Sequence, residues 1–183
     1  MSDETAAPPA PDAQPTLVVN AQYVKDLSFE NPNAPSSLMQ QGNEPNVQVG
    51  VDTSVAQIEG STYEVTLTVR AEGTASDAAL FLVEVAYAGV VTLGEMPEEY
   101  VMPMLYVEAP RLLFPFARSV VAEAVRDGGF PPLLIHPVDF MTLFQQRAQQ
   151  AQELAEAEQK KGADGSGGTP PDGDGEQKFE FEL

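Results

Sequence analysis

Four segments of the chain alternate apolar and polar residues with a period of two, and this pattern constrains the fold more than any other feature. In the clearest of them, Tyr63, Val65 and Leu67 alternate with polar residues. A period of two is typical of strands in a sheet with one buried face. The segments are residues 17–28, 47–52, 63–71 and 81–88. Their connections are too short for crossover helices, so we predict an antiparallel sheet.

Alternation also predicts which side chains share a face of this sheet. The pattern predicts one face for Leu17, Val19, Ala21 and Tyr23. Near the end of the first strand, Asp26, Ser28 and Glu30 are spaced so that they share one face. In the fourth strand, Glu84 lies on the other face of the strand from Phe81 and Val83. Two interpretations remain open for these acidic positions. They either form an ordinary solvated face or a docking surface for a basic partner.

The second half of the chain changes to a helical period. Apolar residues follow helical spacing from Pro97, and Pro110 is expected to restart the helix, which ends at Gly128-Gly129. Pro115 should kink this helix or lie in its first turn. A final helix is predicted from about Val138. Strands followed by helices indicate the α+β class, with a four-stranded antiparallel sheet, a long kinked helix and a C-terminal helix.

Composition divides the chain into one domain and two tails. Residues 1–15 are acidic and Pro-rich, and we predict that they are disordered. Residues 16–158 form the predicted domain. Residues 159–183 form a predicted flexible tail, in which residues 162–176 hold six of the 14 glycines. The tail ends in Lys178–Leu183, where aromatic and acidic residues alternate, and this hexamer is either a solubilising end or a short docking peptide.

Charge excludes one broad class of function. The formal net charge is -19, and residues 16–150 alone carry -10. Sequence-independent binding of nucleic acid needs clustered Lys and Arg, so it is excluded. A basic protein surface is the partner that such a field attracts.

Catalytic, metal-binding and membrane-spanning patterns are missing from the sequence. The chain contains no Cys, and His136 is its one histidine, so thiol chemistry and His-rich zinc motifs are excluded. No G-x-S-x-G motif occurs. We therefore predict a protein that is not an enzyme and that needs no cofactor or metal. No apolar run is long enough to span a membrane, and the first residues do not resemble a secretory signal, so we expect a cytoplasmic location.

The helical region around residues 101–113 is apolar on too many sides to be covered by one face of a sheet. Such excess apolar surface indicates oligomerisation or a binding groove.

Three blocks of the sequence are distinctive when they are taken together and in this order. The first block runs from Tyr23 to Pro35, YVKDLSFENPNAP. The second is LLFPFAR at 112–118 with Gly129-Phe-Pro131, and the third is Pro137-Val-Asp-Phe140 with Leu143-Phe144. These blocks resemble the SecB family of bacterial protein-export chaperones, and the resemblance covers about residues 17–150. It implies helices on one face of the sheet and assembly as a dimer of dimers, with strand-four residues at the tetramer interface. The matching interface residues are Val83, Val85 and Tyr87.

The resemblance also implies a function without a catalytic residue or ATP. Members hold unfolded preproteins in apolar grooves, at positions matching Tyr23, Phe81, Phe116 and Phe144. They deliver this cargo to the translocase motor SecA through an acidic sheet surface. The matching SecA-binding positions are Asp26, Glu30, Leu82 and Glu84. Two alternatives remain open at this point: a SecB-like chaperone dedicated to a toxin–antitoxin system, and an acidic adaptor without holdase activity.

Overall fold

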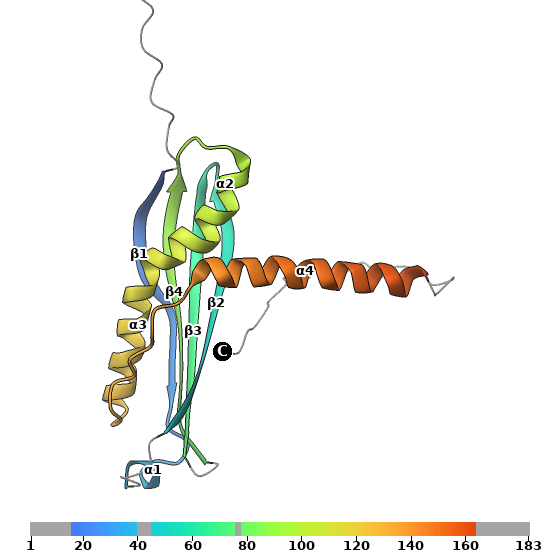
Figure 1. The fold of residues 1–183 in the computed structure, drawn as a ribbon. Coiled ribbons are helices and arrows are strands. Elements are labelled where there is room, and N and C mark those ends of the chain that lie inside the picture. The colour runs from blue at the N-terminus through green and yellow to red at the C-terminus, as the bar shows by residue number, and fades with distance from the viewer. Residues whose placement is uncertain (1–15, 40–44, 76–77, 164–183) are drawn as a thin grey trace, which may run out of the picture.

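The computed structural model describes residues 16–39, 45–75 and 78–163, which form a four-stranded antiparallel sheet covered by helices (Figure 1). The strand order is β1-β4-β3-β2. The strands are β1 Leu17–Glu30, β2 Asn46–Glu59, β3 Thr62–Ala75 and β4 Ala78–Leu93. The predicted α+β class and antiparallel sheet are confirmed, and the strands are longer than the alternating segments that predicted them. The N-terminal tail and residues 164–183, including the hexamer at 178–183, lie outside the described residues.

Connections between strands follow from turn chemistry. A tight turn at Gly60, with a φ of 53°, joins β2 to β3, a backbone conformation that glycine adopts without steric cost. The longer connection after β1 carries the one-turn helix α1, Ser36–Met39, at the tip of the sheet (Figure 1). Because β1 and β2 are the two edge strands, this connection crosses from one edge of the sheet to the other.

Two β-bulges in β1 alter the faces predicted by strict alternation. The register between β1 and β4 shifts between Val19 and Ala21 and again between Val24 and Asp26. Each bulge adds one residue to β1 and so reverses the phase of the residues that follow. Leu17 and Val19 face the helices, whereas Ala21 and Tyr23 lie on the other face, which we call the open face. The prediction that these four residues share a face was therefore wrong.

The long helical segment is continuous but irregular. It consists of α2 (Glu98–Pro103), a π-helical turn η1 (Met104–Glu108) and α3 (Ala109–Asp127). Pro110 and Pro115 cannot donate backbone hydrogen bonds, and the wide turn before Pro110 accommodates its ring. The segment changes direction as it crosses the sheet (Figure 1). Pro115 lies inside α3 and not in its first turn, and a kink at Pro115 itself stays a prediction. It ends at Gly128 and Gly129, and Gly129 has a φ of 91°.

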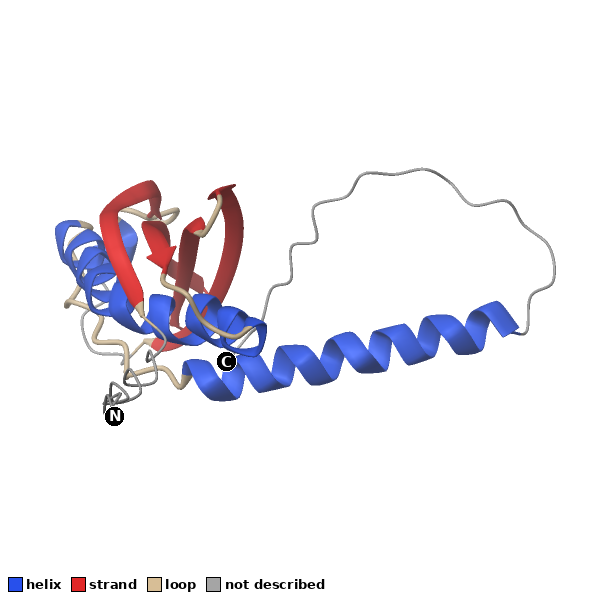
Figure 2. Cartoon of the chain, turned by 90° about the horizontal axis from the view of Figure 1, so that it is seen from above, coloured by secondary structure: helices blue, strands red, loops and turns tan. Residues whose placement is uncertain are grey.

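The C-terminal helix α4, Phe140–Ala163, projects away from the sheet in both views (Figures 1 and 2). Phe140 is buried, Leu143 and Phe144 are half-buried, and residues 148–153 are exposed. Among residues 140–153, whose burial is described, the first two turns therefore pack against the domain. The helix continues past the boundary at residue 158 that composition predicted.

Leu113 of α3 lies at the centre of the core, fully buried against β4. A Cβ added at Gly89 of β4 would come within 2.8 Å of the Leu113 side chain, so helix and sheet are in close contact here.

Truncating this contact should destabilise the domain. We expect Leu113→Ala to lower the free energy of unfolding by about 2–5 kcal/mol, because it removes buried methyl groups and leaves a cavity. Urea denaturation at fixed chain concentration measures this. The matched control is Leu134→Ala, the same truncation at a side chain that is 78% exposed. Equal denaturation midpoints for the two variants would contradict the central position of Leu113.

Candidate functional site

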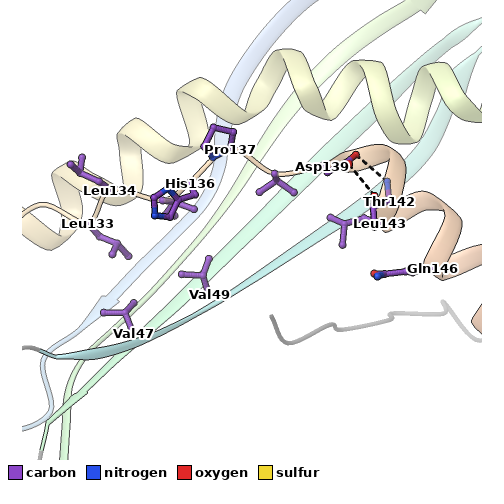
Figure 3. Close-up of a pocket in the computed structure, with 12 residues that line it drawn as sticks. Val47, Val49, Leu133, Leu134, His136, Pro137, Asp139, Thr142, Leu143 and Gln146 are labelled. Atoms are coloured by element: carbon purple, nitrogen blue, oxygen red, sulfur yellow. Dashed lines mark hydrogen bonds between the residues drawn. The ribbon is translucent and has the colours of Figure 1, made fainter.

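An apolar groove of about 510 Å³ lies between β2, the connector before α4 and the first turns of α4 (Figure 3). Val47 and Val49 of β2 point toward the connector from one side, and Leu143 closes one end. The lining residues are Val47, Val49, Leu133, Leu134, Ile135, His136, Pro137, Val138, Asp139, Thr142, Leu143 and Gln146. Prolines hold the connector extended, which leaves an elongated apolar surface rather than a closed cavity.

The backbone edge of β2 runs along this groove. Among the described strands, β2 pairs only with β3, so its other edge is unpaired. The carbonyl oxygen of Thr53 accepts a hydrogen bond from Arg147 of α4 at 2.7 Å and therefore points away from β3. In an antiparallel pair, the backbone N–H and C=O groups of every second residue point away from the partner strand. Val47, Val49 and Val51 have the same phase as Thr53, so their backbone groups also lie on the unpaired edge of β2. Arg147 also pairs with Asp52 and covers the edge at this end.

Asp139 fixes the start of α4 at the groove. Its Oδ1 accepts hydrogen bonds from the backbone N–H groups of Met141 and Thr142, each at 3.1 Å, and its Oδ2 accepts the Thr142 hydroxyl at 2.9 Å. This is the arrangement of a helix N-cap. The backbone hydrogen bond from Thr142, followed by that from its hydroxyl, holds the pKa of Asp139 below its ordinary value.

This lowered pKa predicts a pH dependence of stability. The ionised cap stabilises the fold at pH values above the ordinary carboxyl pKa, and its contribution is lost as the pH falls through the lower folded-state pKa. Asp139→Asn retains an accepting oxygen without the charge. We therefore expect the wild-type chain to be the more stable near neutral pH, and the difference to disappear under strongly acidic conditions. Thermal denaturation of both chains across pH measures it, and a difference that grows on acidification would contradict the assignment.

The four residues predicted to form a preprotein groove are not brought together within the chain. Tyr23 lies on the open face, whereas Phe81 is 2% exposed and stacks with Phe29, with ring centroids 6.3 Å apart. Phe116 stacks on Tyr87 at 6.2 Å, and Phe144 stacks on Tyr106 at 6.2 Å. None of the four lines the 510 Å³ groove. Their contact with preproteins stays a prediction.

The groove itself was missed by sequence reasoning. Its available signal was the run Leu133-Leu-Ile135, an apolar segment without helical or strand period between prolines. Such a segment cannot form a regular element of its own, and its apolar side chains must lie on a neighbouring surface. Nothing in the sequence pairs it with β2.

The four predicted SecA-binding residues do lie together on the open face. Glu30 is directly opposite Leu82, and the neighbouring pairs are Ser28 with Glu84 and Asp26 with Ala86. Glu72 of β3 lies opposite Leu82 from the other side and adds a further acid that the sequence interpretation missed. The resulting acidic open face carries Asp26, Glu30, Glu72 and Glu84. Arg70, opposite Glu84 in β3, is the nearby cation in this register.

A polar cluster on the same face lies beside this surface. Tyr23 donates a hydrogen bond to Glu64, and Lys25 forms an ion pair with Glu64 at 2.6 Å. The hydrogen bond from Lys25, followed by that from Tyr23, lowers the pKa of Glu64, while the bond to Glu64 raises the pKa of Tyr23. Lys25 therefore pairs with a carboxylate of β3, Glu64, and not with the acidic residues of the open face.

The three predicted tetramer-interface residues face the chain's own helices. Val83 and Val85 are fully buried and Tyr87 is nearly so. Tyr87 stacks against Phe116 of α3, a residue that remains 48% exposed. These strand residues can therefore influence assembly only indirectly, by fixing where α3 lies on the sheet.

Comparison with known proteins decides the family. The family model described as "Preprotein translocase subunit SecB" matches residues 10–151. The chain belongs to the SecB family. This match includes all four strands, the long helix, the groove and the first turns of α4. The role of the family in protein export and its lack of enzymatic activity therefore apply to this chain.

Relatives in the SecB family cover most of the chain. The protein-export protein SecB of Rhodopseudomonas palustris is 48% identical over 154 residues, 84% of this chain and 98% of the relative. That of Afipia carboxidovorans is 47% identical over 154 residues, 84% of this chain and 96% of the relative. A SecB-like chaperone of Mycobacterium tuberculosis, solved with an antitoxin peptide, shares the fold with a TM-score of 0.57 at 12% identity. That alignment covers 67% of this chain and 90% of the other.

Two further properties concern the described part of the SecB-family chain. None of its helices is long and apolar enough to cross a membrane. Within residues 16–39, 45–75 and 78–163, no three His, Cys, Asp or Glu side chains are grouped so that they could hold a metal ion.

Proposed function

We propose that this chain is an ATP-independent holdase of the cytoplasm, which binds unfolded preproteins in the apolar groove and delivers them to SecA. The observation that carries the proposal is the position of the groove beside the unpaired edge of β2. An extended chain laid there can bury alternate side chains against Val47 and Val49 while its backbone bonds to the strand edge. Backbone bonds are independent of sequence, which suits a protein with many clients.

The direct test uses a preprotein that refolds slowly. At one assembled chaperone per preprotein, we expect refolding to be delayed strongly, because the chaperone binds the unfolded state and not the native state. Intrinsic fluorescence of a Trp-containing preprotein reports refolding without interference, since this chain contains no Trp. Unchanged refolding at several chaperone concentrations would sink the holdase proposal.

Delivery to SecA is assigned to the acidic open face. Asp26, Glu30 and Glu84 lie on one face, and Leu82 provides an apolar contact among them. A basic segment of SecA would gain favourable charge interactions with this surface and find an apolar contact at its centre. The groove opens on the helix side of the sheet, so cargo and motor can be bound at the same time.

Assembly into a dimer of dimers is proposed through the outer surface of α3. Leu112 and Phe116 are each 48% exposed and lie one turn apart on the helix. Exposed apolar residues with this spacing are suited to helix–helix packing between subunits.

Phe116→Asp should therefore prevent the complete assembly. We expect the native mass of the unchanged protein to be about four times the chain mass of 19.6 kDa, and the mass of the variant to fall to that of a dimer or monomer. Light scattering coupled to gel filtration measures both. Leu134→Asp, which places the same charge on an exposed residue of the connector, should leave the mass unchanged. A variant that retains the mass of four chains would exclude this surface.

The two alternatives are less well supported. Relatives at 47–48% identity over 84% of the chain are protein-export proteins, whereas the antitoxin-associated chaperone shares 12% identity. An adaptor that bridges folded partners would have no use for an apolar groove beside a free strand edge.

A further inference from the structure

We propose that the segment Lys178–Leu183 of this chain docks in the apolar groove as an added strand on β2 and competes there with preproteins. The competition rests on the proposed holdase function, whereas the docking itself does not. The segment lies beyond residues 10–151, which the SecB family model matches, so the proposal rests on this chain's own sequence.

The sequence of the segment suits this position. Phe179, Phe181 and Leu183 alternate with Lys178, Glu180 and Glu182. In an extended strand the three apolar side chains share one face and the charged ones share the other. Val47 and Val49 show the same two-residue spacing on the groove side of β2. A strand paired with this edge would place its apolar face over the groove.

The charged face of the added strand meets no unpaired acid among the described residues of β2 in this position. It would lie on the open-face side of β2, where the residues between Val47 and Val51 are Gln48 and Gly50. Asp52, the next acid along the strand, is already paired with Arg147. Glu180 and Glu182 can thus remain solvated beside neutral neighbours, which keeps the electrostatic cost of docking small.

The available length of the edge fits a short segment. Arg147 donates a hydrogen bond to the carbonyl oxygen of Thr53, so the unpaired part of the β2 edge ends at this residue. From Asn46 to Thr53 the strand offers about seven residues of edge, or about 23 Å at the rise of a strand. A hexamer occupies about 20 Å. Arg147 therefore limits the register in which the segment can add.

The connecting chain is long enough to bring the segment back. Ala163, the end of α4, lies 17 residues after Gln146 of the groove, which is about 26 Å along the helix axis. Residues 164–177 provide 14 residues rich in Gly. A flexible linker of that length has a root-mean-square span of about 20 Å and a maximum of about 46–50 Å. The groove is within reach without movement of α4.

Tethering makes even a weak contact effective. A flexible linker of this span gives a local concentration on the order of 1 mM at the groove. A segment of six residues with millimolar affinity would then occupy the groove for a substantial fraction of the time, yet a long preprotein making many contacts would displace it. The arrangement would protect the apolar groove between clients and favour long unfolded chains over short peptides.

The test compares the full chain with a chain that ends at Gln177. Methyl NMR of Val47, Val49, Leu133 and Leu143 should show shift differences between the two, while methyl groups of the distant core, such as Val121, remain unchanged. The shortened chain should bind a fluorescently labelled unfolded preprotein about twofold more tightly, because a competitor of millimolar affinity at a local concentration of about 1 mM occupies the groove about half of the time. Phe179→Ser with Phe181→Ser in the full chain should reproduce both effects.

The matched control keeps the apolar face and changes the charged one. Glu180→Gln with Glu182→Gln should retain the methyl shifts of the full chain. Identical groove methyl shifts in the full and shortened chains would overturn the docking, and equal preprotein affinities would overturn the competition. If the methyl shifts differ but neither chain delays refolding, the holdase function fails and the docking stands. If both chains delay refolding equally and their methyl shifts coincide, the holdase function stands and the docking of Lys178–Leu183 fails.

Discussion

Reversing the charges of Asp26 and Glu84 together should weaken binding of SecA by about a hundredfold, or about 2.7 kcal/mol. Both residues lie on the acidic open face, on strands β1 and β4, within the same short stretch of paired residues. An exposed pair of unit charges about 4 Å apart contributes about 1 kcal/mol in water, and reversal replaces attraction by repulsion at each position, a change of about 4 kcal/mol for two positions that screening by salt reduces. Isothermal titration of SecA into the Asp26→Lys, Glu84→Lys chain measures the loss, which salt should diminish.

The control separates position from total charge. Glu59→Lys with Glu95→Lys changes the net charge by the same amount with two exposed residues away from this surface. These changes should alter SecA affinity only slightly, and neither pair should affect the delay of preprotein refolding. If both double variants lose SecA affinity equally, the interaction depends on net charge alone and the acidic open face is not the docking site.

A charge in the apolar groove should have the second large effect, on preprotein binding. Val47→Asp places a carboxylate among apolar side chains that an unfolded segment must cover, and burying an unpaired charge is costly. We expect the affinity for an unfolded preprotein to fall at least tenfold, which corresponds to about 1.4 kcal/mol. Fluorescence anisotropy of a labelled preprotein measures it.

The strand offers its own control for this variant. Ile58→Asp introduces the same charge into β2 at a side chain that is 58% exposed and does not line the groove. It should bind the preprotein as the unchanged chain does. Equal losses in the two variants would indicate a general effect of charge, and no loss at Val47 would place the preprotein elsewhere, for example at the predicted residues Phe116 and Phe144.

The secondary structure could be predicted from the sequence because its signals are local. The alternation at Tyr63–Leu67 and the prolines and glycines around the long helix depend only on neighbouring residues. Both the class of the fold and the end of α3 at Gly128 follow from such signals. The projection of α4 is not a local property, since it depends on where Phe140 and Leu143 find a surface to pack against.

The bulges in β1 explain why alternation predicted the correct face of the sheet for Asp26 and Glu30 but the wrong face for Tyr23. Asp26 follows both register shifts, and two reversals of phase restore the original alternation. Tyr23 lies between the shifts and is reversed once. A bulge depends on the partner strand, so alternation within β1 contains no signal for it.

The groove could not be predicted for a related reason. Val47 and Leu133 are far apart in the sequence, and the connector has no period from which its facing could be inferred. The resemblance to the SecB family predicted a preprotein groove at aromatic residues, and three of these, Phe81, Phe116 and Phe144, stack on other rings of the chain and do not line the groove beside β2.

The two bulges also determine where relatives of different length can be aligned with this chain. Asn20 and Lys25 are the residues that β1 carries in excess of β4. A relative that lacks one of them retains every other side chain of β1 on its present face. A one-residue gap elsewhere in the strand would exchange the faces of the residues on one side of that gap. If the displaced part is the C-terminal one, Phe29 becomes exposed in place of the acids. Alignment gaps within β1 therefore belong at the positions of Asn20 and Lys25.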